Sequence, residues 1–367
     1  MPKRIVISTS NDISTDNRVH KVAMLLRSLG YEVLWVGRKL PTSLAIERPY
    51  QIRRLSLMFK KGVLFYAELQ VRLFFFLLTY RSTHLLSNDL DTLLPNYLVS
   101  RLFHSTLIYD THEYFCGVPE LEGRFAKKVW QGLERSLFPR VEHIWTVNES
   151  IADLYEADYG KRPKVFRNIS PMPEGFERVS RGKLGLPENK IIAINQGSGM
   201  NLDRGLEEAV EAIDGMSEEW MLLLVGSGDA IPALKESVRQ RGLESKVFFV
   251  GRVPYAQLLQ YTAAADIGLS LDKDTNINYR FSLPNKLFDY LHCGIPIVTS
   301  PLVEVARIVE GYCVGATVEP TDIEALRNTM VQVVAQRELY AKGIERVQRE
   351  LNWARESEAL MRFYDRL

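Results

Sequence analysis

One polar stretch combines residue types that suit a phosphate group. The run Ser282-Leu283-Pro284-Asn285-Lys286 precedes a predicted short helix that ends near His292. The start of a helix presents unpaired N–H groups and the positive end of the helix dipole, which together attract anions. Lys286 adds a positive charge there, and Asp289, one turn further on, could accept hydrogen bonds from a sugar diol. On spacing alone, an ordinary helix cap explains these residues equally well.

A second candidate phosphate site follows the predicted strand Ile191–Asn195. The small-residue turn Gln196-Gly197-Ser198-Gly199 comes next, and Arg204-Gly205 opens a predicted helix through Ile213. The planar guanidinium of arginine can grip phosphate oxygens with two hydrogen bonds. A glycine-rich turn by itself is a weak signal.

Polar residues also follow two predicted strands in the first half of the chain. Asn88 and Asp89 end one strand, and Asp110-Thr111-His112-Glu113 follows the next one, Thr106–Tyr109. Ligands bind beyond the carboxyl ends of parallel strands in open α/β sheets. A lone histidine in such a loop more often satisfies local hydrogen bonds, so residue type alone does not make His112 a functional residue.

The order of predicted elements indicates an α/β fold. A strand at Arg4–Thr9, a helix at Asn17–Leu29 and a strand at Glu32–Val36 form a βαβ unit, from which a parallel sheet follows. The segment Ile169–Asn189 is rich in Pro, Gly and charge and reads as a linker. The βαβ rhythm restarts after it. From these residues alone, Asp16 caps the first helix and Arg18 is a solvated charge.

Size and composition agree with two globular domains. The chain has 367 residues, of which 46% are apolar and 25% charged, and its net charge of +1 gives no general attraction to nucleic acid. Three widely spaced cysteines argue against a disulfide framework and for a reducing compartment. The start Met1–Arg4 runs into a strand and is not expected to be a signal peptide. The longest apolar run, Leu73–Leu78, is shorter than a membrane span requires.

The segment Gln51–Tyr80 interleaves basic and aromatic residues. Such a pattern on a helix can lie on an anionic membrane surface. The alternative is a core helix from about Val63 to Thr79 whose apolar face packs on the sheet, as any large α/β domain requires. We favour the core helix on this evidence.

The stretch Ser282–Tyr290, followed by Gly294-Ile295-Pro296-Ile297, resembles a motif of the family 4 glycosyltransferases, which are retaining enzymes of the GT-B fold. The matching pattern is S-x-P-N-K-[LI]-[FI]-[DE]-Y and then G-x-P-[IV]. The family usually has two glutamates in this region. Asp289 falls on the second, which binds the donor ribose, and Phe281 falls on the first, which faces the donor sugar. The role of the first glutamate therefore does not carry over to this chain.

The resemblance extends over nearly the whole sequence. It includes D-x-R-V at the first helix, N-D-x-D-T-L and Y-D-[ST]-H-E after two strands, and G-x-V-P near Arg252. Arg204 stands where the family usually has a lysine that reaches the diphosphate. The resemblance implies catalytic roles for His112, Arg204 and Lys286. It implies donor contacts for Gly197, Ser198, Arg252, Ser282, Pro284, Asn285, Leu287 and Asp289, and acceptor contacts for Arg18, Asn88, Asp89, Glu113 and Asn168.

The implied fold is GT-B, with two Rossmann-like domains facing a central cleft. Residues 1–168 would bind the acceptor, residues 169–350 the nucleotide sugar, and residues 351–367 would form a helix that returns to the first domain. The implied reaction is a metal-independent, retaining hexosyl transfer (EC 2.4) without a cofactor. The donor would be a UDP- or GDP-sugar, and the acceptor a glycan or lipid-linked glycan of polysaccharide or glycoconjugate assembly. The expected location is cytoplasmic, with the inner face of the membrane as an alternative.

Two other functions remain open from the sequence. GT-B sugar-nucleotide epimerases share the architecture, although the D-T-H-E segment fits a transferase better. A non-catalytic nucleotide-sugar-binding partner of a glycan-assembly enzyme is the other alternative, because Phe281 replaces the usual glutamate. Product formation from a labelled donor would distinguish the partner protein from a transferase, and epimerisation without acceptor would identify the epimerase.

Overall fold

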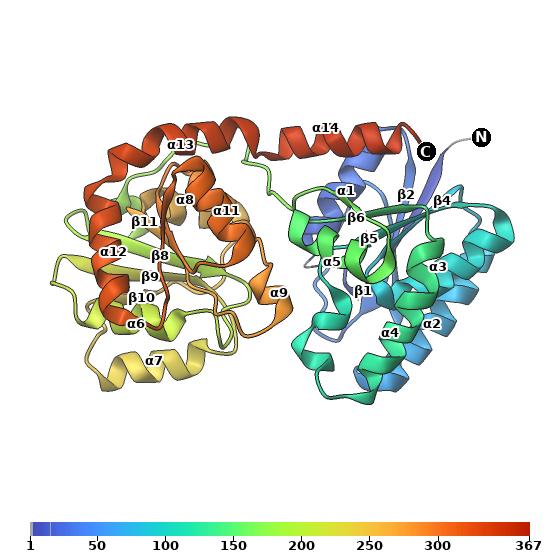
Figure 1. The fold of residues 1–367 in the computed structure, drawn as a ribbon, viewed down its shortest axis with the longest axis horizontal. Helices are drawn as coiled ribbons and strands as arrows, with labels where there is room; N and C mark the ends of the chain where they lie inside the picture. Colours follow the sequence, from blue (N-terminus) through green and yellow to red (C-terminus); the bar gives the residue numbers. More distant parts are fainter. Residues whose placement is uncertain (1–2, 15) are drawn as a thin grey trace. The chain divides into compact units, whose positions relative to one another are not determined.

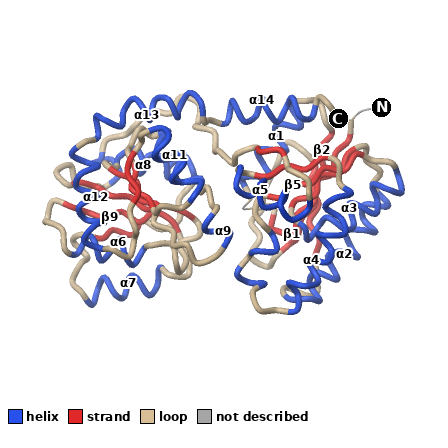
Figure 2. Tube along the Cα trace, viewed as in Figure 1, coloured by secondary structure: helices blue, strands red, loops and turns tan. Residues whose placement is uncertain are grey.

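The computed structural model describes residues 3–14 and 16–367 and divides into two compact units (Figure 1). The first unit comprises Met1–Asn168 with Glu356–Leu367, and the second comprises Ile169–Arg355. Met1 and Pro2 of the predicted N-terminal start, and Thr15 of the loop before the first helix, lie outside the described residues. Strands form the interior of each unit and helices its outside (Figure 2).

The first unit is built on a parallel sheet, which has seven strands in the described part of the chain. Their order is β3-β2-β1-β4-β5-β6-β7. The strands are β1 (Arg4–Asp12), β2 (Glu32–Lys39), β3 (Gln51–Ser56), β4 (His84–Asn88), β5 (Thr106–Thr111), β6 (His143–Thr146) and β7 (Lys164–Val165). Every residue of β4 is buried, as expected for a central strand covered on both faces.

The helices of the first unit are α1 (Asn17–Ser28), α2 (Gly62–Thr79), α3 (Leu90–Phe103), α4 (Phe125–Leu137), α5 (Glu149–Tyr159) and α14 (Trp353–Tyr364). The side chain of Asp16 accepts a hydrogen bond of 3.0 Å from the backbone N–H of Val19, so the predicted helix cap is confirmed. Val19, Val22 and Leu26 point into the core. This cap and apolar face fix which residues of α1 point toward solvent.

The second unit has its own parallel sheet, with six strands among the residues described. The order is β10-β9-β8-β11-β12-β13. The strands are β8 (Ile191–Gly197), β9 (Trp220–Gly226), β10 (Val247–Phe249), β11 (Ile267–Ser270), β12 (Ile297–Thr299) and β13 (Gly315–Thr317). The helices are α6 (Leu206–Asp214), α7 (Ile231–Gln240), α8 (Tyr255–Ala264), α9 (Ile277–Arg280), α10 (Asn285–His292), α11 (Val303–Tyr312), α12 (Ile323–Ala335) and α13 (Arg337–Glu350).

The C-terminal helix packs against the first unit, as the sequence predicted. Leu360, Phe363 and Tyr364 of α14 join the core cluster formed by β1, β2 and α1. The carboxylate of Glu356 accepts a hydrogen bond of 3.0 Å from the backbone N–H of Arg167. These contacts place the end of the chain in the same unit as its beginning.

Several elements were not expected from the sequence. The strand β3 and the helices α7 and α13 had no prediction, and α9 lies in a segment expected to be a polar loop. β3 is an edge strand whose pairing with β2 leaves it partly exposed, so its sequence carries arginines instead of a continuous apolar run. Pairing with β2 makes this segment a strand, and the local sequence does not reveal that pairing.

The helix predicted from about Val63 to Thr79 is α2, and one apolar face of it is buried as predicted. Its buried positions form a single stripe, made of Phe65, Leu69, Leu73 and Leu77. Of the helices in the described residues, α2 is long and apolar enough to cross a membrane by length and composition alone, and only 22% of it is buried. The sequence estimate from the run Leu73–Leu78 therefore missed a longer apolar segment, in which Glu68 and Arg72 are the interruptions.

Candidate functional site

In the second unit, glycines allow the loops that follow three strands to approach one another. Gly205 precedes α6 with a φ of +70°, and a Cβ there would stand 2.2 Å from the backbone oxygen of Leu271, just after β11. Gly226 ends β9, and a Cβ on it would stand 1.8 Å from the backbone oxygen of Gly197 at the end of β8. Only glycine fits at such contacts. The loops after β8, β9 and β11 therefore form one packed edge of the sheet.

This edge holds two cations on one buried carboxylate. Nη1 of Arg204 lies 3.2 Å from Oδ1 of Asp272, and Nζ of Lys286 lies 3.7 Å from Oδ2. The side chain of Asp272 is 1% exposed, whereas those of Lys286 and Arg204 are 12% and 27% exposed. Two positive groups and one negative group leave a net positive charge beside the start of α10. The cations predicted from two distant motifs are thus brought together.

Burial and the neighbouring charges change the pKa of Lys286, and an aromatic contact holds Arg204. Burial lowers the pKa of Lys286, Asp272 opposes that change, and the neighbouring charge of Arg204 lowers the pKa further. The guanidinium of Arg204 also lies over the ring of Tyr279 of α9, with its Cζ atom 4.2 Å from the ring centroid. Each of these contacts restricts where the two cations can point.

Several buried polar atoms at this edge have no hydrogen-bond partner among the described residues. They are Nε of Arg204, Oγ of Ser282, Oγ1 of Thr299 and Oγ of Ser300. Buried polar groups in native proteins are normally hydrogen-bonded, so unsatisfied donors gathered near a net positive charge indicate a place for an anionic ligand. The arrangement can bind an anion with more than one acceptor oxygen.

Asp289 of α10 lies at the centre of a separate hydrogen-bond network. The hydroxyl of Tyr255 donates to its Oδ1 at 2.8 Å, and Nε2 of Gln196 donates to its Oδ2 at 3.0 Å. Asp289 is 5% exposed. Burial, with the charge of Asp289, raises the pKa of Tyr255, which keeps that phenol protonated as a donor. The predicted contact of Asp289 with a ribose remains a prediction, and any ligand would share this carboxylate with two protein donors.

The other predicted donor contacts have varied settings. Gly197 is half-buried, and Ser198 and Arg252 are exposed. Pro284 stands before the first turn of α10, which begins at Asn285. The side chain of Leu287 is fully buried in the core of the second unit, so its contribution is to packing. Phe281, which replaces the family's first glutamate, ends α9 and is half-buried.

In the first unit, Arg18 of α1 organises the ends of β4 and β5. Its Nη1 donates to Oδ2 of Asp110 at 2.6 Å, and its Nη2 donates to Oδ1 of Asn88 at 3.1 Å. The same Nη2 lies 2.7 Å from Nδ1 of His112. The side chain of Arg18 is 12% exposed and that of Asp110 is 1% exposed. The interpretation of Arg18 as a solvated charge, drawn from the residues alone, was therefore wrong.

The contact with Arg18 defines the protonation of His112. A guanidinium only donates hydrogen bonds, so in this contact Nδ1 of His112 accepts, and we assign the ring proton to Nε2. Burial lowers the pKa of His112, and the charge of Arg18 lowers it further. The side chain keeps 28% of its surface exposed. His112 therefore presents a neutral imidazole that can donate a hydrogen bond from Nε2.

The buried carboxyls of Asp89 and Asp110 lie close to this histidine, and that of Asp91 lies near Asp89. Oδ1 of Asp89 lies 3.0 Å from Nδ1 of His112. Burial raises the pKa of Asp89 to about 7, that of Asp91 to about 8 and that of Asp110 to about 6. Arg18 counteracts the rise for Asp89 and Asp110, whereas the charge of Asp89 adds to it for Asp91. Asp89 also has a φ of +60°, a strained conformation for a residue other than glycine.

Of the remaining predicted acceptor residues, Glu113 follows His112 in sequence and Asn168 is bonded to the helix that carries Arg18. Glu113 is half-buried, and its backbone oxygen accepts hydrogen bonds from Oγ1 of Thr111 at 2.9 Å and from the hydroxyl of Tyr155 at 3.3 Å. Oδ1 of Asn168 accepts a hydrogen bond of 2.8 Å from Lys21, which lies one turn beyond Arg18 on α1. The first-unit residues predicted from separate motifs are therefore linked through α1 and the ends of β4 and β5.

Sequence reasoning missed Asp272, Gln196, Tyr255 and Asp91. Asp272 follows the end of β11 by two residues, so the rule that ligands bind beyond the carboxyl ends of parallel strands could have identified it. Gln196 stands within β8, and Tyr255 begins α8. Nothing local marks these two, because their significance comes from the distant carboxylate that they contact.

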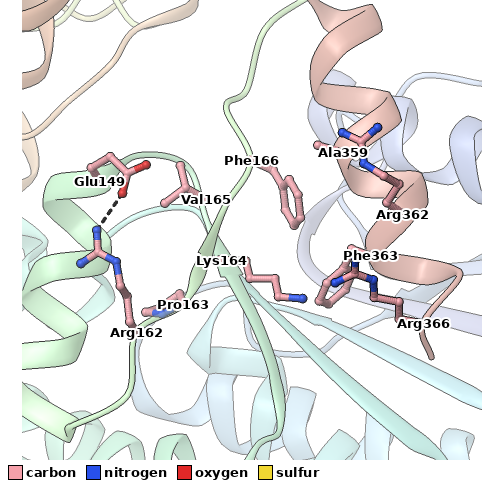
Figure 3. Close-up of a pocket in the computed structure, with 10 residues that line it drawn as sticks. All are labelled: Glu149, Arg162, Pro163, Lys164, Val165, Phe166, Ala359, Arg362, Phe363 and Arg366. Carbon is pink, nitrogen blue, oxygen red and sulfur yellow. Dashed lines mark hydrogen bonds and ion pairs between the residues drawn. The ribbon is translucent and has the colours of Figure 1, made fainter.

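A pocket of about 450 Å³ lies elsewhere in the first unit, where β7 meets α14 (Figure 3). Its lining includes Lys164, Phe166 and Phe363, and Glu149 pairs with Arg162 at 2.7 Å. None of the predicted site residues is in its lining as described. The pocket is therefore separate from both polar networks.

Comparison with known proteins supports the fold across the whole chain. Sucrose-phosphate synthase from Thermosynechococcus elongatus superposes with a TM-score of 0.81 at 17% identity, over 99% of this chain and 98% of that one. HepE of Anabaena in complex with UDP-glucose gives 0.76 at 14% identity, over 99% and 100%. WaaG, a glycosyltransferase involved in lipopolysaccharide biosynthesis, gives 0.74 at 14% identity, over 97% and 98%. These similarities confirm the predicted GT-B fold.

Sequence comparison gives a narrower match. The family described as glycosyl transferases group 1 matches residues 197–336, a range that contains Arg204, Asp272 and Lys286. No curated protein sequence gives a significant match. Residues 197–336 of the second unit are thus similar to the group 1 glycosyl transferases, and the whole chain has the GT-B fold.

Proposed function

We propose that the protein transfers a sugar from UDP-glucose or a related UDP-sugar to the hydroxyl of a glycan or a lipid-linked glycan, with retention at the anomeric carbon. The group 1 match supports glycosyl transfer, and HepE, which shares the fold, has been crystallised with UDP and with UDP-glucose. We further propose that the reaction proceeds without a metal or cofactor, in the cytoplasm or at the inner face of the membrane.

The pairing of Arg204 and Lys286 on Asp272 is the observation that carries this proposal. Departure of a nucleoside diphosphate develops negative charge on the leaving phosphate. Cations held in advance at that position stabilise the transition state without reorganising. The start of α10 adds the positive end of a helix dipole at the same edge of the sheet.

We assign His112 a hydrogen bond from Nε2 to the reacting sugar or the acceptor. A neutral imidazole that donates stabilises developing charge on oxygen without adding a second cation beside an oxocarbenium-like centre. In this mechanism the departing phosphate accepts the proton of the acceptor hydroxyl. Arg18, Asn88, Asp89, Glu113 and Asn168 are the proposed acceptor-side residues.

The first test is the thermal stability of the protein with UDP, GDP and their sugar conjugates. A ligand that binds only the folded state stabilises it, by about 2.7 kcal/mol at a concentration of 100 times Kd. We expect UDP to raise the melting temperature by about 5 to 10 °C under that condition. Arg204→Ala and Lys286→Ala should each weaken UDP binding about 10- to 100-fold, because each removes a charge-assisted hydrogen bond.

Matched controls separate the site from general loss of charge. Arg239→Ala and Lys342→Ala remove exposed cations elsewhere in the second unit and should leave the UDP-dependent shift unchanged. No shift with UDP or GDP, or equal loss in the control variants, would refute the anion site. Binding of UDP-glucose without UDP release in the presence of a panel of glycan acceptors would instead support a non-catalytic sugar-nucleotide binder.

A further inference from the structure

Helix α2 is apolar on two opposite sides. Its inward stripe packs in the first unit, as described above. On the other side, Leu64, Val71 and Phe75 are 58%, 55% and 61% exposed. Their spacing of seven and four residues keeps them on one face. A helix that is apolar all round is normally buried in a core or in a membrane, so the outward stripe of α2 requires a partner.

The loop before α2 and the first turn of the helix extend the same apolar surface. Met58 and Val63 are each 75% exposed, and Phe59 is 41% exposed. The loop is held in place by Glu68 of α2, whose Oε2 accepts hydrogen bonds from the backbone N–H groups of Met58 at 2.8 Å and Phe59 at 3.0 Å. The exposed side chains are therefore fixed against the helix by a specific contact.

The start of α4 contributes two more apolar residues. Phe125 and Val129 are 79% and 55% exposed and lie one turn apart. Tyr66 of α2 contacts Trp130 of α4, with ring centroids 5.1 Å apart. Both helices connect parallel strands of one sheet, so they run in the same direction, and both begin at the end where the strands finish. Their first turns therefore share one end of the unit.

The charges on this surface are unequal. Lys60, Lys61, Arg124 and Lys128 are exposed around the apolar residues. Two carboxylates of the same segments are already paired, Glu68 with Arg72 at 2.8 Å and Glu122 with Lys127 at 2.6 Å. Exposed aromatic and aliphatic side chains bordered by exposed lysine and arginine match a bilayer with anionic headgroups.

We propose that this end of the first unit binds an anionic lipid bilayer. The docking face consists of Met58–Leu64, Val71 and Phe75 of the α2 region with Phe125 and Val129 of α4. Helix α2 lies in the plane of the membrane, because its inward stripe remains packed on the protein. The same end carries the carboxyl ends of β4 and β5 and hence His112, so a lipid-linked acceptor would reach that network from the membrane.

The test is sedimentation of the full-length protein with vesicles in low salt, without nucleotide or sugar. We expect binding to vesicles of phosphatidylcholine with 30% phosphatidylglycerol, at least about tenfold weaker binding to phosphatidylcholine alone, and weakening by added salt. The double substitutions Lys60→Glu/Lys61→Glu and Val71→Ser/Phe75→Ser should each reduce binding about tenfold or more. Unchanged melting temperatures would show that these exposed substitutions leave the fold intact.

The matched controls change the same chemistry elsewhere. Lys183→Glu/Lys342→Glu makes the same charge change in the second unit, and Leu339→Ser removes an exposed apolar residue there. Both controls should bind vesicles like the parent protein. Absence of vesicle binding, or equal loss in the controls, would overturn the proposal and leave a protein partner as the occupant of this face. Equal binding to neutral and anionic vesicles would overturn the selectivity for anionic lipid. The assay does not depend on nucleotide binding, so its outcome is separate from that of the proposed function.

Discussion

Arg18 fixes the chemical state of His112. The guanidinium contributes donors only, so the ring nitrogen that faces it must be unprotonated. The neighbouring Asp89 has a raised pKa, which permits that carboxyl to carry a proton near neutral pH and to stand close to the same nitrogen. Arg18, His112 and Asp89, which all have ionisable side chains, thereby share one buried site.

We predict that Arg18→Gln raises the pKa of His112. The substitution removes the positive charge that lowers this pKa, so the value should move toward about 6.5 without reaching it, because burial remains the larger cause. The imidazole would then protonate at a higher pH than in the parent protein. NMR titration of the histidine ring protons measures this directly, with His112→Gln to assign the resonance.

Arg18→Lys is the matched control, because it keeps the positive charge and should keep the pKa of His112 low. If Arg18→Gln and the parent protein titrate identically, the proposed control of His112 by Arg18 is wrong. The same titration would show whether transfer activity, once an acceptor is known, follows the neutral form of this residue.

At the scale of elements, the anion site depends on how closely loops can approach. Arg204 belongs to the loop before α6, and Asp272 to the loop after β11. Gly205 lies between them with a positive φ and no room for a side chain. The loops meet because this position is a glycine.

We predict that Gly205→Ala lowers the free energy of unfolding by at least about 3 kcal/mol, since a left-handed conformation and a steric clash act together. It should also weaken UDP binding, because Arg204 is the preceding residue. Gly242→Ala is the control, with a φ of +66° and nothing within 4 Å of the added Cβ, and should cost about 1 kcal/mol. Urea denaturation measures both values, and equal costs would show that the close approach of the loops is unimportant.

The sequence predicted helices and strands correctly where the two patterns alternate along the chain and each has a clear beginning and end. The bounds of α1 and β8 agree with prediction within two residues, and α10 ends at His292 as predicted. The edge strand β3 and the exposed face of α2 did not follow, because pairing and burial are set by partners distant in the chain. Pattern alone assigns apolar residues to a core, whereas α2 has more of them than its unit can bury.

At the scale of the whole molecule, the last helix ties the C-terminus to the first unit. Phe363 of α14 is 4% exposed and contacts the ring of Phe166, with centroids 5.6 Å apart. It also lies beneath Lys164, whose Nζ is 4.8 Å from the ring centroid, at the pocket shown in Figure 3. The first unit is therefore completed by residues from both ends of the sequence.

We predict that Phe363→Ala destabilises the first unit by about 3 to 5 kcal/mol, because it leaves a cavity in that core. Trp145 contacts Phe166 and reports on the same cluster by fluorescence during urea denaturation. The Kd for UDP should not change, since the proposed anion site lies in the second unit. Leu339→Ala, at a position 63% exposed, should change stability by less than about 0.5 kcal/mol, and an equal effect of the two substitutions would contradict the packing role of α14.

The sequence by itself determined the α/β class, the two-unit organisation of the GT-B fold and the resemblance to a glycosyltransferase family, because helix and strand periodicity and the motif around Asn285 and Lys286 are local properties. It also indicated Arg204, Lys286 and His112 as chemical groups. Only the tertiary structure decided that Asp272 forms ion pairs with both cations and that Arg18 sets the tautomer of His112. It also decided that Tyr255 and Gln196 donate hydrogen bonds to Asp289. These contacts join residues far apart in the chain, and their energetics depend on burial, which folding creates and local sequence does not specify.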